Sequence, residues 1–248
     1  MKLLLINPNT SPFVTDMVAA AARTVIAPDV ELTAVTGTYG PPIVSGRSED
    51  ALAAVEAMRL ALEHAPGHDA VVLAISFDSG LQALRERLDI PVVGMTEAAM
   101  LTAMAVADRF ALITFGYHAR GIYVELARRY GLDARMSTVL SLPQLSDEQI
   151  RDPARVFPAL RNLIEEVVRK DQAEAIILSG AIFANICGDI APLVSVPVLN
   201  GVREAVGIAQ SLVRLNLKKP LSGSYRLPEP KPVKWPFDVI ERAYQSPS

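Results

Sequence analysis

Polar side chains follow several of the chain's short apolar runs, and their types suit the binding or deprotonation of a small carbonyl compound. Ser76, Thr114 and Ser179 each lie at or just beyond the end of such a run. Asp78 follows two residues after Ser76. Hydroxyls can hydrogen-bond a carbonyl oxygen, and a carboxylate can act as a general base. The pattern predicts a small-molecule site at which the ends of several runs meet.

Asp78 and His118 are the candidates for catalytic proton transfer. Asp78 precedes an expected helix over residues 81–88, so it is expected to cap this helix, to serve in a cleft as a base or water-orienting carboxylate, or to do both. His118 follows a turn expected after Thr114, and histidine is the side chain whose ordinary pKa suits proton transfer near neutrality. The alternative roles of His118 are helix capping and solvent exposure.

Six residues are expected to bind substrate. A serine without a partner is a poor acid or base, and no Ser-His-Asp arrangement is evident, so we expect Ser76 and Ser179 to form hydrogen bonds rather than to attack. Backbone amides near Asn9, after the first apolar run, could hold a carboxylate or ureide oxygen. The expected substrate-binding residues are Asn9, Ser76, Thr114, Phe115, Ser179 and Gly180.

Composition argues against several classes of protein. The 248 residues are 50% hydrophobic and carry 24 basic and 27 acidic side chains, for a net charge of -3. No basic stripe suits nucleic acid, and no apolar run approaches the roughly 18 residues of a membrane span, so neither partner is expected. One cysteine excludes an intrachain disulfide framework, and three histidines argue against a metal site. The apolar start is too short for a signal peptide, so we expect a cytoplasmic protein.

Short apolar runs alternate with amphipathic stretches, which is typical of parallel α/β sheets. The runs cover residues 3–6, 30–35, 70–75, 91–93, 110–114, 175–178 and 196–199. Apolar residues at three- and four-residue spacing predict helices over 48–64, 96–107, 120–130 and 158–169. The expected fold class is α/β, with helices flanking parallel sheets.

The two halves of the chain follow the same order of elements. Residues 69–107 read strand, turn, helix, strand and helix, and residues 174–213 repeat this order with closely matching spacings. We therefore expect two pseudosymmetric lobes, the first made of residues 1–97 with 206–248 and the second of 98–205. Ligands of open α/β sheets bind beyond the carboxyl ends of the strands, so the site should lie between the lobes.

The C-terminal segment differs from the rest of the chain. Residues 219–236 contain five prolines and cannot continue a helix. We expect an extended arm followed by a short helix, which either packs against the body or a neighbouring subunit or forms a mobile tail. A homo-oligomer is expected.

Four motifs follow the expected strands at characteristic intervals. They are Asn7-Pro8-Asn9-Thr10, Gly40-Pro41-Pro42 with Ser45-Gly46, Pro91-Val92-Val93-Gly94 with Glu97-Ala98-Ala99, and Pro197-Val198-Leu199-Asn200-Gly201-Val202. Together they resemble the aspartate/glutamate/hydantoin racemase superfamily, and most of all its hydantoin and allantoin racemase branch, over residues 1–215. The resemblance implies two pseudosymmetric α/β lobes, no cofactor, and two cysteines on opposite sides of the substrate's acidic carbon. One thiolate would remove the proton, and the other thiol would return one.

Both cysteine positions of that branch are occupied by other residues here. Matching the branch's two motifs to this chain places Ile75 at the first position and Gly180 at the second. The single thiol, Cys187, lies seven residues beyond Gly180, which is about 10 Å along a helix and too far to replace the missing group. We expect Cys187 to be buried and inert, and Gly180 to leave room for a larger substrate or a water molecule.

Glu97 and Asn200 also lie near the expected cleft. Glu97 follows Thr96 at a helix start, where the helix dipole favours a carboxylate, and we expect its role to be structural. Asn200 stands where relatives are expected to carry an acidic residue, which removes a charge near the cleft.

The residues support two hypotheses about function. The first is a cofactor-independent enzyme that acts on a small cyclic ureide, hydantoin or related carbonyl or carboxylate compound by thiol-independent lyase, hydrolase or isomerase chemistry. The alternative is a catalytically silent member of the superfamily that binds a small ligand. Turnover distinguishes the two.

Overall fold

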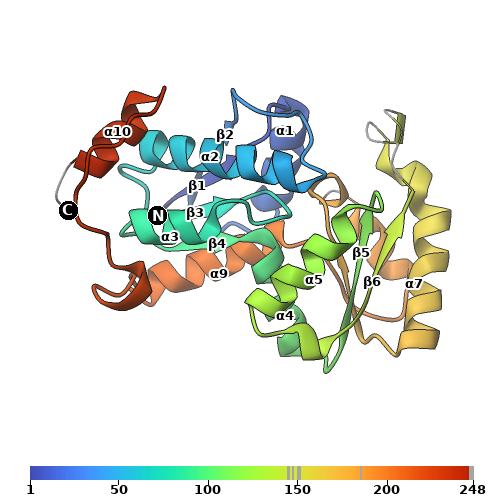
Figure 1. The fold of residues 1–248 in the computed structure, drawn as a ribbon. Coiled ribbons are helices and arrows are strands. Elements are labelled where there is room, and N and C mark those ends of the chain that lie inside the picture. Colours follow the sequence, from blue (N-terminus) through green and yellow to red (C-terminus); the bar gives the residue numbers. More distant parts are fainter. Residues whose placement is uncertain (144–145, 147, 150–151, 185, 246–248) are drawn as a thin grey trace.

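Two four-stranded parallel sheets organise the molecule, and they have the same strand order. The computed structural model describes residues 1–143, 146, 148–149, 152–184 and 186–245. The first sheet has the order β2-β1-β3-β4 and the second the order β6-β5-β7-β8. We refer to the half around each sheet as the first and the second lobe (Figure 1). The matching orders confirm the internal duplication inferred from the sequence.

The central strands are buried on both faces, which explains their uninterrupted apolar sequences. The strands are β1 (Lys2–Asn7), β2 (Glu31–Thr36), β3 (Ala70–Leu73), β4 (Val92–Gly94), β5 (Phe110–Phe115), β6 (Met136–Leu142), β7 (Ala175–Leu178) and β8 (Val198–Leu199). Every residue of β3 and β7 is buried. Strand β6 was not expected from the sequence, because this edge strand mixes serine and threonine with apolar residues and forms no continuous apolar run.

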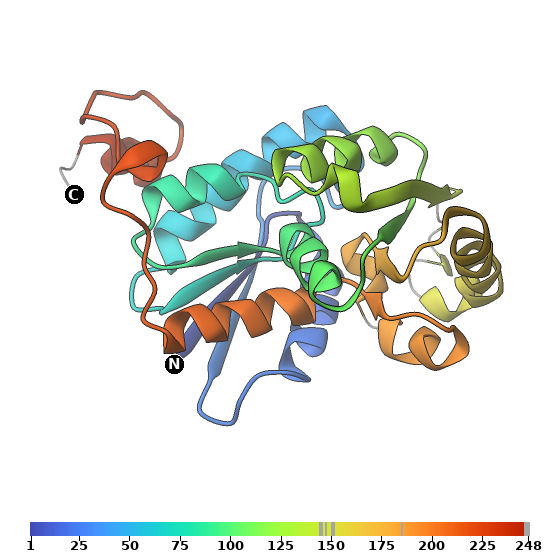
Figure 2. The same ribbon diagram turned by 90° about the horizontal axis from the view of Figure 1, so that it is seen from below.

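Helices cover both faces of the sheets (Figure 2). They are α1 (Pro12–Arg23), α2 (Arg47–His64), α3 (Leu81–Arg87), α4 (Met95–Val106), α5 (Ala119–Arg129), α7 (Phe157–Asp171), α8 (Cys187–Ile190), α9 (Val202–Arg214) and α10 (Asp238–Gln245). Short 3-10 turns occupy Asp133–Arg135, Pro153–Val156, Ala181–Phe183, Ala191–Leu193 and Gly223–Tyr225. The four helices predicted from apolar spacing are confirmed as α2, α4, α5 and α7.

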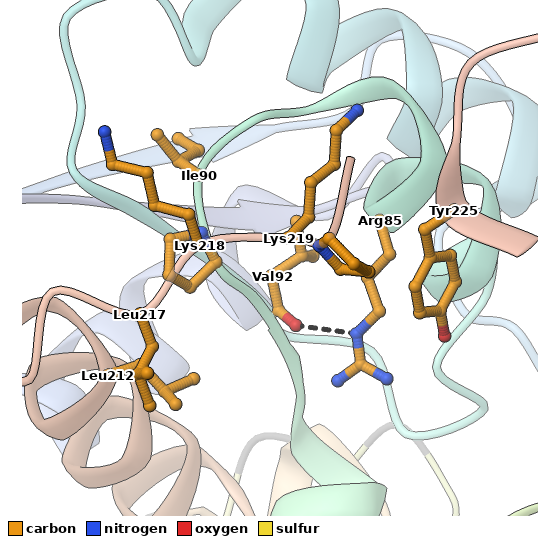
Figure 3. Close-up of a pocket in the computed structure, with 10 residues that line it drawn as sticks. Arg85, Ile90, Val92, Leu212, Leu217, Lys218, Lys219 and Tyr225 are labelled. Carbon is orange, nitrogen blue, oxygen red and sulfur yellow. Dashed lines mark hydrogen bonds between the residues drawn. The ribbon is translucent and has the colours of Figure 1, made fainter. Parts of the chain in front are cut away.

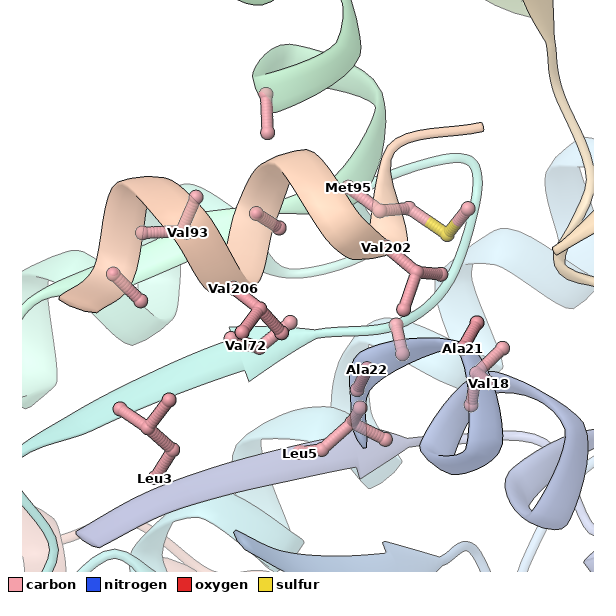
Figure 4. Close-up of a cluster of buried hydrophobic side chains, with 14 of the residues drawn as sticks. Leu3, Leu5, Val18, Ala21, Ala22, Val72, Val93, Met95, Val202 and Val206 are labelled. Atoms are coloured by element: carbon pink, nitrogen blue, oxygen red, sulfur yellow. The ribbon is translucent and has the colours of Figure 1, made fainter. Parts of the chain in front are cut away.

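One core of the first lobe lies between its sheet and two helices that are far apart in the sequence. Helix α9 packs on β3, β4 and α1. Figure 4 shows Val202 and Val206 of α9 above Val72 of β3, with Leu5 and Val18 alongside. All five side chains are fully buried. Burial of this apolar surface holds the chain after β8 against the first lobe.

The chain crosses between the lobes at two adjacent places. It passes from the first to the second lobe after β4, and it returns near Gly201. Gly201 has φ +103°, and a Cβ on it would lie 2.0 Å from the carbonyl oxygen of Met95. Only glycine permits this backbone conformation and this close approach of the two crossings.

The C-terminal arm packs against the first lobe. Lys219 Nζ donates a 2.8 Å hydrogen bond to the Glu86 carbonyl oxygen and pairs with Asp89 at 3.1 Å. Farther along, α10 packs on α2, and the Phe237 ring lies 4.8 Å from the Tyr39 ring, centroid to centroid. Of the alternatives considered for the arm, packing against the body is the one observed. None of the described helices is both long and apolar enough to cross a membrane.

Candidate functional site

A pocket opens at the carboxyl ends of the central strands of both sheets, where a parallel α/β fold places its ligands. Its described lining residues are Asn9, Val14, Ile43, Val44, Ala74, Ile75, Ser76, Phe115, Gly180, Ala181 and Ile182. The segments after β1, β2 and β3 supply one wall, and the last residue of β5 with the segment after β7 supplies the other. Among the described lining residues, Asn9 and Ser76 carry the polar side chains and the others are apolar.

Ile75 and Gly180 line this same pocket from opposite lobes. Each lies two residues beyond the end of a central strand, Ile75 after β3 and Gly180 after β7. The structure therefore brings together the two positions that the internal repeat relates. Neither residue carries an ionisable group.

The Phe115 ring fills the space beside Gly180. Gly180 has φ +137°, and a Cβ on it would lie 2.6 Å from Phe115 Cε1. The ring also packs edge-on against Phe183, with centroids 5.7 Å apart. The ring thus occupies the position that a Cβ would take, while Gly180 itself lines the pocket. That Gly180 leaves room for a larger substrate or a water molecule stays a prediction.

Asn9 is fixed by a hydrogen-bond network at the end of β1. Its Oδ1 accepts from the backbone N–H of Ser11 at 3.0 Å and from Asn7 Nδ2 at 2.8 Å. A backbone N–H can only donate, so the atom that faces the Ser11 N–H must be the Asn9 amide oxygen rather than its nitrogen. Asn7 Nδ2 also donates to the Thr15 hydroxyl at 2.9 Å. The Asn9 amide is thus held with its NH₂ group outside this network.

Ser76 belongs to a buried group of hydroxyls centred on Tyr123. Tyr123, on α5 of the second lobe, donates a 3.0 Å hydrogen bond to Ser76 Oγ in the first lobe. Burial raises the pKa of Tyr123, and the neighbouring hydroxyls of Ser179, Ser76 and Thr114 act in the opposite direction. Ser179 and Thr114 are both about 1% exposed and do not line the pocket. The sequence reasoning missed Tyr123, although its place on the apolar face of an amphipathic helix signals a buried hydroxyl that needs a partner.

Asp78 caps a helix, but not the one expected. Its carboxylate accepts from the backbone N–H groups of Thr96, at 3.1 Å, and Glu97, at 2.8 Å, at the start of α4. The residue before α3 is Gly80, so the expected capping of that helix is wrong. Burial raises the pKa of Asp78 to about 7, opposed by hydrogen bonds from Tyr130 and the two amides. Asp78 is 2% exposed and is not among the pocket-lining residues.

His118 lies on the surface at the beginning of α5. Its ring is exposed and contacts Tyr117 edge-on at 6.5 Å between centroids. It borders an open depression with Arg120 and Val139, separate from the pocket between the lobes. The structure therefore brings Asn9, Ser76, Phe115 and Gly180 together and places His118 elsewhere.

Glu97 and Asn200 have structural contacts. Glu97 pairs with Arg85, whose Nη1 donates to Glu97 Oε1 at 2.9 Å, in keeping with the expected structural role. Asn200 Nδ2 donates to the carbonyl oxygens of Leu178, at 2.8 Å, and Gly180, at 3.0 Å. An ionised carboxylate has no proton to donate, so these two contacts require the amide.

Cys187 does not reach the pocket. It begins α8, is 4% exposed and belongs to the core of the second lobe. Burial raises the pKa of its thiol well above the usual range, so the thiolate needed for reaction is disfavoured. No group of three or more His, Cys, Asp or Glu side chains within the described ranges could hold a metal ion.

A second cavity, of about 180 Å³, lies between α3, the end of α9 and the C-terminal arm (Figure 3). Arg85 on its wall is committed to Glu97 and to the Val92 carbonyl oxygen, 3.0 Å from its Nε. The Tyr225 hydroxyl bonds Gln82 on α3. The Tyr225 contact fastens the arm to the first lobe.

Two duplicated parallel α/β lobes, with a small pocket between them whose described lining is largely apolar, define a two-lobed α/β protein. The model of the Asp/Glu/Hydantoin racemase family matches residues 3–209, and the chain belongs to this family.

The similarity to known proteins extends over nearly the whole chain. A hydantoin racemase of Paenarthrobacter aurescens is 33% identical over 236 residues, which cover 93% of this chain and 99% of that protein. The solved allantoin racemase of Klebsiella pneumoniae is 31% identical, with a TM-score of 0.90 over 96% of this chain and 98% of that one. The allantoin racemase of Pseudomonas fluorescens is 33% identical, with a TM-score of 0.91 over 95% and 100% of the two chains. The two-lobed racemase fold is thereby established for this chain.

Proposed function

We propose that the chain is an isomerase-class enzyme that acts on a small cyclic ureide, such as a hydantoin or allantoin, in the pocket between the lobes. The observation that carries the proposal is the convergence of Ile75 and Gly180 on one pocket at the ends of β3 and β7. The hydantoin and allantoin racemases that are similar over nearly the full chain support this substrate class.

The proposed chemistry uses no thiol. Neither Ile75 nor Gly180 offers one, and Cys187 is buried outside the pocket. Neither Asp78 nor His118 is among the residues that line the pocket. Each remains a proposed proton-transfer residue only if its own substitution slows the reaction. A proton carried by a water molecule held at Ser76 is the competing route.

The test is incubation of the purified protein with enantiopure hydantoins and allantoin in deuterated water. Deuterium exchange with loss of optical activity is the expected result, and ring opening would indicate a hydrolase instead. The cysteine-free variant Cys187→Ala is the matched control and should retain the activity. Its complete loss, in a folded variant, would contradict the thiol-independent mechanism.

A catalytically silent binding protein is the second candidate. It is favoured by one observation: among the described pocket-lining residues, none has an ionisable side chain. Binding of hydantoin or allantoin by calorimetry, without exchange or ring opening, would establish this function and exclude the enzyme.

A further inference from the structure

Asn9 and Ser76 are the polar side chains among the described lining residues, and each keeps part of its hydrogen-bonding capacity for a ligand. Asn9 Oδ1 is occupied by the backbone N–H of Ser11 and by Asn7 Nδ2. Asn9 is 7% exposed, and within the described part of the chain no acceptor bonds its Nδ2. The bonding capacity that Asn9 retains for a ligand is therefore the donor capacity of its NH₂ group.

The Tyr123 hydroxyl leaves Ser76, like Asn9, as a hydrogen-bond donor toward the pocket. A phenol is a better donor and a poorer acceptor than an alkyl hydroxyl, and Tyr123 directs its O–H to Ser76 Oγ at 3.0 Å. Tyr123 is 1% exposed, and its ring is held edge-on by Phe77 at 5.4 Å between centroids. Since Ser76 Oγ already accepts this bond, its own proton is free to point into the pocket.

We propose that Tyr123 is a positioning residue which holds Ser76 as a donor, so that the pocket selects ligands with neutral carbonyl oxygens and rejects ligands with an ammonium group. Asn9 and Ser76 then present donors from one lobe to two ligand oxygens. No carboxylate among the described lining residues offsets an ammonium group. Burying an unpaired charge in an apolar pocket is costly, so zwitterionic amino acids are excluded while neutral cyclic ureides are accepted.

This inference rests on the proposed cyclic ureide site and is tested by calorimetric titration of the full chain with hydantoin and with L-aspartate. We expect wild type to bind hydantoin and not aspartate. Tyr123→Phe, which keeps the ring, should weaken hydantoin binding about tenfold. Tyr225→Phe is the matched control, because it removes a phenol hydroxyl that bonds Gln82 away from this pocket, and it should leave the affinity unchanged.

A double-mutant cycle separates positioning from general packing. If Tyr123 acts through Ser76, then Tyr123→Phe should have no further effect on hydantoin affinity in a Ser76→Ala background. Additive losses would overturn the inference while leaving the proposed function intact. Aspartate binding as tight as hydantoin binding in wild type would also overturn it, whether or not the variants fold. Failure of wild type to bind any cyclic ureide would instead refute the proposed function.

Discussion

Tyr130 donates a 2.7 Å hydrogen bond to Asp78 Oδ2 and thereby joins the two lobes. Tyr130 directly follows α5 in the second lobe as its C-cap, whereas Asp78 lies in the turn after β3 of the first. Tyr123, seven residues earlier and thus about two helical turns away, bonds Ser76 in the same turn. One face of α5 therefore holds the segment that carries Ser76 into the pocket.

The raised pKa of Asp78 predicts a pH dependence of stability. The carboxyl has a pKa of about 7 in the folded protein against 3.8 in its ordinary state, so between these values the folded protein binds more protons than the unfolded chain. Its stabilising contribution is complete below about pH 4 and is lost as the pH rises through 7. The full difference corresponds to roughly 4 kcal/mol, as an order of magnitude.

Asp78→Asn isolates this effect. Urea unfolding of wild type and variant across pH 4–8 should show wild type losing stability relative to Asp78→Asn as the pH rises. A stability difference that is constant across this range would show that Asp78 does not titrate there.

Tyr130→Phe should destabilise the protein by about 1–3 kcal/mol, because it removes a donor from a buried carboxyl group. Arg47→Ala is a suitable comparison. Arg47 and Glu125 form an ion pair between the lobes, with Nη2 and Oε1 2.5 Å apart, but both side chains are at least half exposed. We expect Arg47→Ala to leave the unfolding midpoint unchanged. Equal losses from the two substitutions would contradict the importance of burial.

Gly180→Ala should cost about 1–3 kcal/mol, because φ +137° is unfavourable for any residue with a Cβ and the Phe115 ring must move. Adding Phe115→Ala to the Gly180→Ala variant should remove the steric contact, so that only the cost of the backbone conformation at position 180 remains. Gly207→Ala is the matched control, since Gly207 lies inside α9 and a Cβ on it would meet no described atom within 4 Å beyond the backbone of its own helix. It should stabilise by about 0.5–1 kcal/mol, as measured by urea unfolding.

Restoring a thiol pair requires three substitutions rather than two. Ile75→Cys with Gly180→Cys places both thiols on one pocket, but the second side chain meets Phe115. We expect little gain in α-proton exchange from the double variant and a clear gain when Phe115→Ala is added, followed by NMR of a hydantoin in deuterated water. Exchange by the double variant equal to that of the triple one would show that the ring moves freely.

Cys187 should be unreactive in the native state. It is 4% exposed, and the raised pKa of its thiol leaves little thiolate. A chromogenic disulfide reagent should label it only as fast as the protein unfolds, and fully in denaturant. Rapid stoichiometric labelling of native protein would refute this burial.

The sequence by itself determined the duplicated α/β architecture, because apolar runs and amphipathic spacing report which residues a sheet and its helices bury. It also identified Ile75 and Gly180 as a related pair, since the relation is one of spacing along the chain. Strand β6 was not predicted, because it lies at the edge of its sheet and is only partly buried, so its sequence contains no continuous apolar run.

Only the tertiary structure decided which polar groups meet. The Asp78 contact with α4 joins residues 18 and 19 positions apart, and the contacts of Tyr123 and Tyr130 span 47 and 52. No local pattern encodes such partners, because they depend on how the two lobes pack. For the same reason, the occupation of the space beside Gly180 by Phe115 was visible only once both strand ends had been brought to one pocket.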